Sequence, residues 1–274
     1  RRPQVMVRVD DRATRLDHVL ADERMPLGCA WLGYFHTGSL APPAVPSGRC
    51  SWHNCGMDSP VRLWRTVVCC CAVTGFLAWQ VASGGFLSRF DVQSAHFARS
   101  IPKNRDFFEI TVMAGLRGII LTVCLPWLAW RSWRDRTWLP VGGFLAVLLL
   151  QTGLVGALKM AFGRSFPYQG DMVLEAGFLA FPSGHAANVV ALWGWMAWYV
   201  SRERPDLTPR LWSGVMAATF VVGYSSWIIR THWPTDLFAG FLLGGAALAT
   251  VVSLVNAIEL SRTATPSHAR AVRP

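Results

Sequence analysis

Phe181-Pro-Ser-Gly-His185 lies where a polar segment meets a long apolar run, and the run begins directly after the histidine. His232-Trp-Pro-Thr-Asp236, further along the chain, repeats this arrangement and places a carboxylate four residues after the imidazole. A histidine at such a boundary faces water while the apolar helix behind it holds it in place. The two stretches therefore predict membrane helices that present two imidazoles at one face of a membrane.

The composition of the chain is also that of a membrane protein. Of its 274 residues, 52% are hydrophobic and only 15% are charged, whereas a soluble domain has about 25% charged residues. The formal net charge is +10, but the basic residues flank the apolar runs, where membrane topology accounts for them. The composition therefore favours a lipid bilayer as the environment and gives no reason to expect a nucleic-acid partner.

Apolar segments of spanning length follow one another through most of the chain. The sequence therefore predicts an all-α fold, an integral membrane six-helix bundle over residues 61–260, with a polar connection at 88–106. The predicted spans are 67–87, 107–130, 138–158, 184–200, 211–229 and 237–260.

The two ends of the chain differ from this pattern. Residues 1–60 lack apolar periodicity and carry Pro and Gly clusters. They are interpreted either as a disordered tail or as a spurious upstream extension ahead of a start at Met57. Residues 261–274 are predicted to form a short basic cytoplasmic tail.

The distribution of basic residues predicts the orientation of the bundle. Six spans place both termini on one side of the membrane, and the segments on that side carry more Lys and Arg than the opposite ones. The sequence therefore predicts a cytoplasmic N-terminus, with both histidine motifs on the extracytoplasmic face of a bacterial plasma membrane. The residues on the terminal side are Arg62, Arg65, Arg131, Arg134, Arg136, Arg202, Arg204, Arg210, Arg262, Arg270 and Arg273. Those on the opposite side are Arg89, Arg99, Lys103, Arg105, Lys159, Arg164 and Arg230.

Metal-binding residues are sparse in the sequence. Cys50 and Cys55 are spaced like a pair of zinc ligands, but no second pair accompanies them. Asp171 and Glu175 are interpreted as solvated residues of their loop. The sequence therefore predicts no metal and no cofactor.

Three segments, Lys159–Pro167, Pro182–His185 and Arg230–Asp236, fall on the same predicted face of the membrane. Their order and spacing resemble the type-2 phosphatidic acid phosphatase superfamily of membrane lipid phosphatases. The pattern of that family is Lys, six residues and Arg-Pro; then Pro-Ser-Gly-His; then Ser-Arg, five residues, His, three residues and Asp. The resemblance extends from about Val67 to Leu260.

The resemblance implies a role for each matching residue. His232 would be the nucleophile that forms a phosphohistidine, Asp236 would orient it, and His185 would be the general acid. The predicted phosphate-binding residues that match the family pattern are Lys159, Ser183 and Gly184, the last through its backbone amide. The residues agree with this chemistry, because a nucleophilic imidazole needs a carboxylate partner and a leaving oxygen needs a proton donor.

Two positions depart from the family pattern. The motif arginines would fall at Phe166 and Ser226, and neither of these residues is basic. Arg164 and Arg230 lie close by in the sequence and are predicted to bind the phosphate instead. Arg117 lies inside the second predicted span, where an unpaired charge is costly, so it should face the bundle or a polar cavity. Two roles are considered for Arg117. It could form a structural ion pair or a contact with a carbonyl group, or it could be a third phosphate-binding arginine.

The sequence thus predicts a metal-independent membrane phosphatase acting on a lipid phosphate or diphosphate, of polyprenyl diphosphate or phosphatidic acid type. The expected partners are the lipid substrate and the bilayer. The alternative is a non-catalytic lipid-phosphate binding or transport protein that kept the fold, and the missing arginines favour it. The retained lysine, histidines and aspartate favour the enzyme, because a binding protein needs no oriented nucleophile.

Overall fold

A computed structural model describes residues 60–264 of the chain. The two predicted tails, together with Met57, Cys50 and Cys55, lie wholly or almost wholly outside this described part. Within residues 60–264 the chain is helical apart from turns and loops, and the only β contact is an isolated bridge between Arg164 and Leu174. The predicted all-α class is therefore confirmed.

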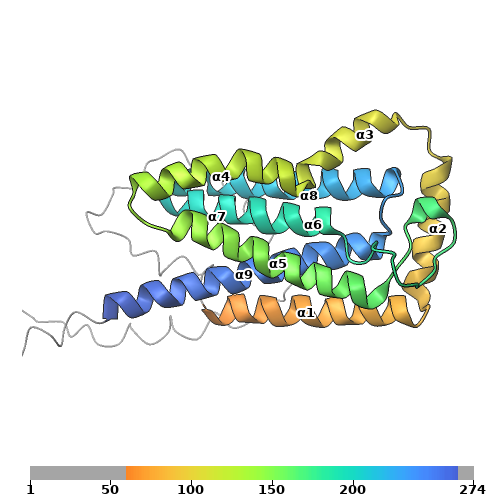
Figure 1. Cartoon of the computed structure of the whole chain (residues 1–274), viewed down its shortest axis with the longest axis horizontal. Coiled ribbons are helices and arrows are strands. Elements are labelled where there is room, and N and C mark those ends of the chain that lie inside the picture. The colour runs from red at the N-terminus through yellow and green to blue at the C-terminus, as the bar shows by residue number, and fades with distance from the viewer. Residues whose placement is uncertain (1–59, 265–274) are drawn as a thin grey trace, which may run out of the picture. The chain divides into compact units, whose positions relative to one another are not determined.

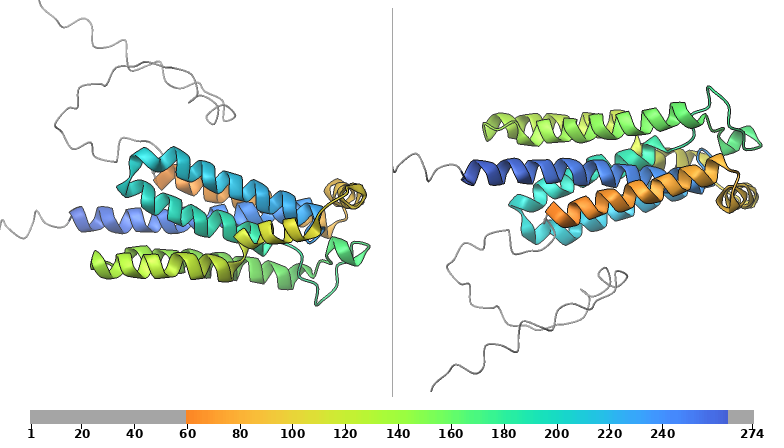
Figure 2. Two further views of the ribbon diagram at one scale, coloured as in Figure 1. Left: turned by 90° about the horizontal axis from the view of Figure 1, so that it is seen from above. Right: turned by 90° about the horizontal axis from the view of Figure 1, so that it is seen from below.

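Four helices of the described part are long and apolar enough to cross a membrane without a break. They correspond to four of the predicted spans, with ends that differ by several residues. Figure 1 shows them running along the same direction, and Figure 2 gives the arrangement from two further sides. They are α1 (Pro60–Ala82), α5 (Leu139–Phe162), α8 (Thr208–Ile228) and α9 (Pro234–Ala264).

The second predicted span is not one straight helix. It consists of α3 (Arg105–Val112), a short 3₁₀ turn and α4 (Arg117–Arg134), and the two α-helices are bent by 46° relative to each other. Leu116, between them, has an extended backbone with φ −74° and ψ 121°. Taken together, the bent pair adds a fifth candidate span to the four in the described residues.

The predicted span at 184–200 is divided into shorter pieces. It comprises α6 (Gly184–Asn188), a π-helical turn at Val189–Trp193 and α7 (Gly194–Glu203), which follow one another without a gap. Figure 1 shows α6 and α7 in line with each other, alongside α5. Because no single helix here has spanning length, the total of six spans stays a prediction.

The segment predicted as a polar connection contains a further helix, α2 (Phe86–Ser100). It crosses the ends of the long helices in Figure 1 and is seen almost end-on in Figure 2. Its buried face includes Ser88 and Asp91, whereas Phe90 and Phe97 are 53% and 61% exposed. With 15 residues, this helix is too short to cross a bilayer. Spanning length and hydropathy therefore could not reveal it.

Helix α9 packs closely against α6 through two glycines. A Cβ atom on Gly240 would lie 2.4 Å from the Ser183 carbonyl oxygen, and one on Gly244 would lie 2.5 Å from that of Ala187. Small residues at such contacts let helix backbones approach closely in membranes. The contact brings the Pro-Ser-Gly-His segment beside the N-terminal end of α9, where the other histidine motif lies.

Candidate active site

His185 lies in the first turn of α6. The Ser183 side chain caps this helix, since its Oγ accepts a hydrogen bond of 3.4 Å from the Ala186 amide. The Ser183 amide donates to the backbone oxygen of Asp236 at 2.9 Å. This bond joins the loop before α6 directly to the first turn of α9.

Helix α9 begins at Pro234, between His232 and Asp236 in the sequence. This start places Asp236 in the first turn of the helix, from which its side chain can reach His232. The Asp236 carboxylate oxygen Oδ2 lies 3.5 Å from His232 Nδ1 and accepts a 3.0 Å hydrogen bond from the Trp233 amide. Asp236 is fully buried, and His232 is 6% exposed. The carboxylate is thus fixed beside one ring nitrogen of His232, which leaves Nε2 as the nitrogen available for chemistry.

A cavity of about 500 Å³ opens beside both histidines. It brings together four of the residues predicted for the site: Lys159, Gly184, His185 and His232. Ser183, Arg164, Arg230 and Asp236 do not line it, although Asp236 contacts His232 from behind. The lining residues are Leu116, Arg117, Lys159, Phe166, Leu179, Gly184, His185, Asn188 and His232.

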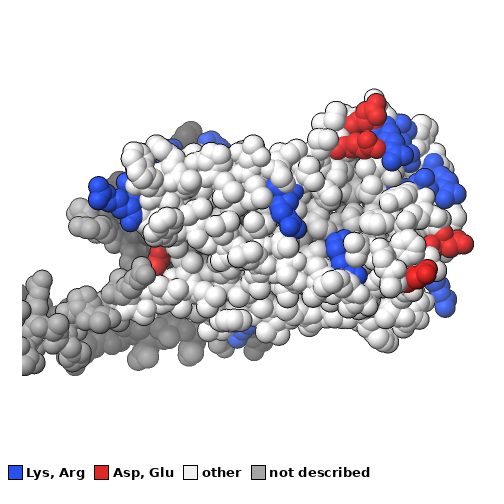
Figure 3. Space-filling model, viewed as in Figure 1, with Lys and Arg blue, Asp and Glu red and all other residues white. Residues whose placement is uncertain are grey.

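The cavity is positively charged. Two of its lining residues, Arg117 and Lys159, are basic, and none is acidic. Lys159 lies in the last turn of α5, and its ammonium group donates a hydrogen bond to the Leu179 carbonyl. On the face drawn in Figure 3, acidic side chains lie towards the two ends, and the charged side chains between them are basic. An arrangement of this kind attracts an anion.

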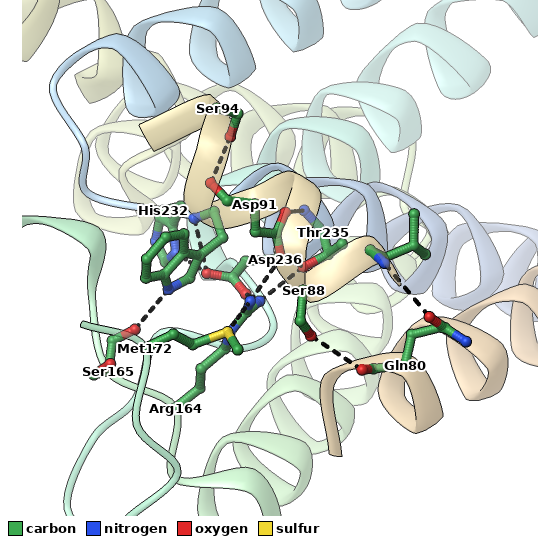
Figure 4. Close-up of polar contacts among 12 residues, drawn as sticks. Gln80, Ser88, Asp91, Ser94, Arg164, Ser165, Met172, His232, Thr235 and Asp236 are labelled. Atoms are coloured by element: carbon green, nitrogen blue, oxygen red, sulfur yellow. Dashed lines mark hydrogen bonds and ion pairs between the residues drawn. The ribbon is translucent and has the colours of Figure 1, made fainter. Parts of the chain in front are cut away.

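Arg164 is not among the residues that line the cavity, and its predicted contact with phosphate stays a prediction. Gly163 ends α5 in a left-handed conformation with φ 53°, and the chain then turns Arg164 inward, where it is 0% exposed. Its guanidinium lies between two buried carboxylates in Figure 4, 2.5 Å from Asp236 Oδ1 and 2.6 Å from Asp91 Oδ2. The Arg164 guanidinium thus joins the Asp236 carboxylate of α9 to the Asp91 carboxylate of α2.

Asp91 on α2 is a site residue that the sequence reasoning missed. Besides its ion pair with Arg164, it accepts hydrogen bonds from the backbone amide of Thr235, at 3.1 Å, and from the Thr235 hydroxyl. Burial raises the pKa of the Asp91 carboxyl, and the charge of Arg164 opposes that shift. The sequence could have indicated Asp91, because a carboxylate on the buried face of a short amphipathic helix needs a buried partner.

Arg230 also lies away from the cavity lining. It is in the turn between α8 and α9 with a φ of 60°. Burial, and then the nearby charges of Arg99 and Arg105, lower the pKa of its guanidinium. In this conformation Arg230 belongs to a group of basic residues at the end of the bundle, and its predicted contact with phosphate stays a prediction.

The two positions of the missing family arginines offer no charge to the cavity. Phe166 lines it, and its ring meets the His232 ring edge to face with centroids 5.7 Å apart. Ser226 is fully buried, and its hydroxyl has no hydrogen-bond partner among the described residues. Any cation that binds a phosphate here therefore comes from elsewhere in the structure.

Asn188 is a second cavity residue that the sequence reasoning missed. Its Nδ2 donates to the Gly115 carbonyl at 3.0 Å, and its Oδ1 accepts from Gln151 at 2.6 Å. The sequence could have indicated Asn188, because it lies three residues after His185 and residues three apart share a helix face. No group of three or more His, Cys, Asp or Glu side chains within residues 60–264 could hold a metal ion.

Comparison with known proteins identifies a relationship over the part of the chain that carries the motifs. The model of the PAP2 superfamily matches residues 140–259. Phosphatidylglycerophosphatase B of Bacillus subtilis (strain 168) is 31% identical over 116 residues, which cover 40% of this chain and 54% of that protein. An uncharacterized 22.5 kDa protein in the cps region of Klebsiella pneumoniae is 33% identical over 109 residues, or 37% of this chain and 49% of that protein. The chain therefore spans about half the length of the curated relatives it matches.

A solved structure shares the fold. The crystal structure of the first transmembrane PAP2 type phosphatidylglycerolphosphate phosphatase from Bacillus subtilis matches with a TM-score of 0.61 and 21% sequence identity. The match covers 74% of this chain and 98% of that one. Together with the apolar helices, it shows that this chain is an integral membrane protein. The predicted resemblance to the PAP2 superfamily is thus confirmed, with a family-model match over residues 140–259.

Proposed function

We propose that this protein is a metal-independent phosphatase that removes phosphate from a membrane lipid phosphate or diphosphate. The observation that carries the proposal is the cavity, where His185, His232 and Lys159 meet and where Asp236 lies 3.5 Å behind one nitrogen of His232. A nucleophile with an orienting carboxylate, a second imidazole and a cation are the groups that phosphoryl transfer through histidine requires.

The first chemical step transfers the phosphoryl group to the protein. His232 Nε2 attacks phosphorus, a P–N bond forms, and the P–O bond to the lipid breaks while His185 protonates the leaving oxygen. Asp236 holds the Nδ1 proton and stabilises the charge that develops on the ring. The 3.5 Å separation is long for a hydrogen bond, and such contacts tighten when substrate binds.

The second step returns the protein to its starting state. Water attacks phosphorus, its proton passes to His185, and the P–N bond to His232 breaks as phosphate leaves. The Gly184 amide, at the start of α6, and Lys159 bind phosphate oxygens in both steps. His185 thus donates a proton in the first step and accepts one in the second, while His232 carries the phosphoryl group between the two steps.

The substrate class follows from the position of the cavity. It lies at the end of spanning helices, and Leu116 and Leu179 in its lining are 41% and 44% exposed. A lipid phosphate can place its headgroup there while its tail stays in the bilayer. A phosphatidylglycerophosphatase among the relatives supports a phosphate monoester lipid, and an extracytoplasmic site in a bacterial plasma membrane would also suit a polyprenyl diphosphate.

The alternative is a protein that binds or transports a lipid phosphate without cleaving it. Phe166 and Ser226 favour this alternative, because the arginines that stabilise the transferring phosphate are missing there. The buried Asp236 beside His232 favours the enzyme, because binding alone does not need an oriented nucleophile.

Phosphate release by the purified protein in detergent tests the proposal. Phosphatidic acid, phosphatidylglycerophosphate and a polyprenyl diphosphate are offered with EDTA present. We expect release by the wild type to fall to background in His232→Ala, and to fall by about 10²–10⁴-fold in His185→Ala, which loses only the general acid.

The matched control is His96→Ala, which removes an exposed histidine of α2 that does not line the cavity. It should retain wild-type release. A folded wild-type protein that releases phosphate from none of the three lipids would support the binding or transport protein instead.

A further inference from the structure

The cavity contains one cation that the family motifs do not supply. Arg117 lines it from the first residue of α4, on a different chain segment from the three motifs. The positions of the motif arginines, Phe166 and Ser226, carry no charge, and Arg164 is enclosed between two carboxylates. Arg117 is therefore the one arginine in the lining of this cavity.

The structure holds the start of α4 firmly against the catalytic helix segment. Asn188 and Trp193 donate hydrogen bonds of 3.0 and 3.1 Å to the carbonyls of Gly115 and Ala114. A Cβ atom on Gly115 would lie 2.8 Å from the His185 carbonyl oxygen. The break between α3 and α4 is thus fixed to the helix that carries His185, and this contact sets the position from which Arg117 enters the cavity.

The charge of Arg117 is not neutralised by the protein. No ion pair or hydrogen bond of its side chain is found among residues 60–264. It also lies at the N-terminal end of a helix, where the helix dipole is positive and a cation is unfavourable. Arg117 is exposed beside the cavity, so an anion can reach its guanidinium. A bound anion would neutralise the charge and offset its unfavourable position at the start of the helix.

We infer that Arg117 binds the substrate phosphate and replaces the two arginines missing at Phe166 and Ser226. This inference rests on the proposed function for the identity of the ligand, a lipid phosphate. The phosphate lies between Arg117 and Lys159, next to His232 and His185, and the guanidinium stabilises charge on the phosphoryl oxygens. The phosphate-binding arginine thus comes from the broken second span rather than from a motif loop.

Measuring the affinity for phosphate tests the binding role of Arg117 separately from hydrolysis. Isothermal titration with inorganic phosphate and with orthovanadate compares the wild type, Arg117→Ala and Arg117→Lys, each in detergent. We expect Arg117→Ala to weaken binding by about 10–100-fold, the equivalent of one charge-assisted hydrogen-bonding group. Arg117→Lys should weaken it less, because it keeps the charge but loses the forked geometry. Arg134→Ala, at the other end of α4, is the control and should bind as the wild type does.

A second measurement needs no variant. Phenylglyoxal modifies accessible arginines, and mass spectrometry follows the labelling of Arg117 in the wild type with and without phosphate. Protection of Arg117 by phosphate, with Arg134 labelled equally in both samples, supports the inference even if Arg117→Ala does not fold. Unchanged phosphate affinity in a folded Arg117→Ala, or equal labelling of Arg117 in both samples, would overturn it.

The two proposals fail in different ways. If the wild type binds phosphate through Arg117 but hydrolyses no lipid phosphate, the proposed enzyme is wrong and the anion site stands. If the wild type hydrolyses lipid phosphate and Arg117→Ala has the same KM and kcat, the enzyme stands and the role of Arg117 is wrong.

Discussion

Replacing Arg164 by leucine should lower the free energy of unfolding by about 3–5 kcal/mol, because it leaves two buried carboxylates without a countercharge. Asp91 and Asp236 are both 0% exposed, and each forms an ion pair with the Arg164 guanidinium. Denaturant unfolding in detergent, followed by circular dichroism, measures the loss. Phosphate release should fall as well, since Asp236 would no longer be held beside His232.

The variant also separates the two roles considered for Arg164. If Arg164 bound phosphate, Arg164→Leu would lose phosphate affinity and keep the stability of the wild type. If Arg164 holds the buried network together, the loss of stability is the main effect of the variant. Arg134→Leu is the control, because Arg134 is exposed and should change the stability by no more than about 0.5 kcal/mol. Wild-type stability in Arg164→Leu would contradict the network.

Replacing Gly240 by alanine should destabilise the protein by about 1–3 kcal/mol and reduce phosphate release. The new Cβ atom would lie 2.4 Å from the backbone oxygen of Ser183, and backbone cannot move aside as the end of a flexible side chain can. Helix α9 would have to move away from α6, and the distance between His185 and His232 would change with it. Thermal unfolding and phosphate release from the same preparation measure the two effects.

Gly245→Ala is the matched control on the same helix. The nearest atom to its Cβ would be 4.0 Å away, on Val190, which is ordinary contact. This variant should be neutral or slightly stabilising, because alanine favours a helix by up to about 1 kcal/mol over glycine. Equal behaviour of the two variants would show that the close contact at Gly240 does not matter for the position of α6.

The sequence predicted the features that depend on local pattern. Apolar length located α1, α5, α8 and α9, because a spanning helix must be apolar along its whole length. The four-residue spacing placed Asp236 beside His232, since it corresponds to one helical turn. The break at Leu116 was missed, because an apolar run has the same hydropathy whether it is straight or bent.

The direction of a side chain is not part of such a pattern. Arg164 and Arg230 were predicted to reach the phosphate because they lie close to the motifs along the chain. Their directions depend on Gly163, which turns the chain inward, and on Asp91, which is distant in sequence from Arg164 and lies on another helix. A pairing between distant segments leaves no periodic signal, so the structure was needed to find it.

The buried network has a consequence for the biosynthesis of the chain. Arg164 pairs with one carboxylate from α2 and with another from α9, the last helix of the described part to be synthesised. A nascent chain that has emerged only as far as α5 and its following loop has Asp91 but lacks Asp236, so the pairing is incomplete. Completion of the buried network therefore waits until the start of α9 has been synthesised, and the position of Asp236 beside His232 is fixed only from that point on.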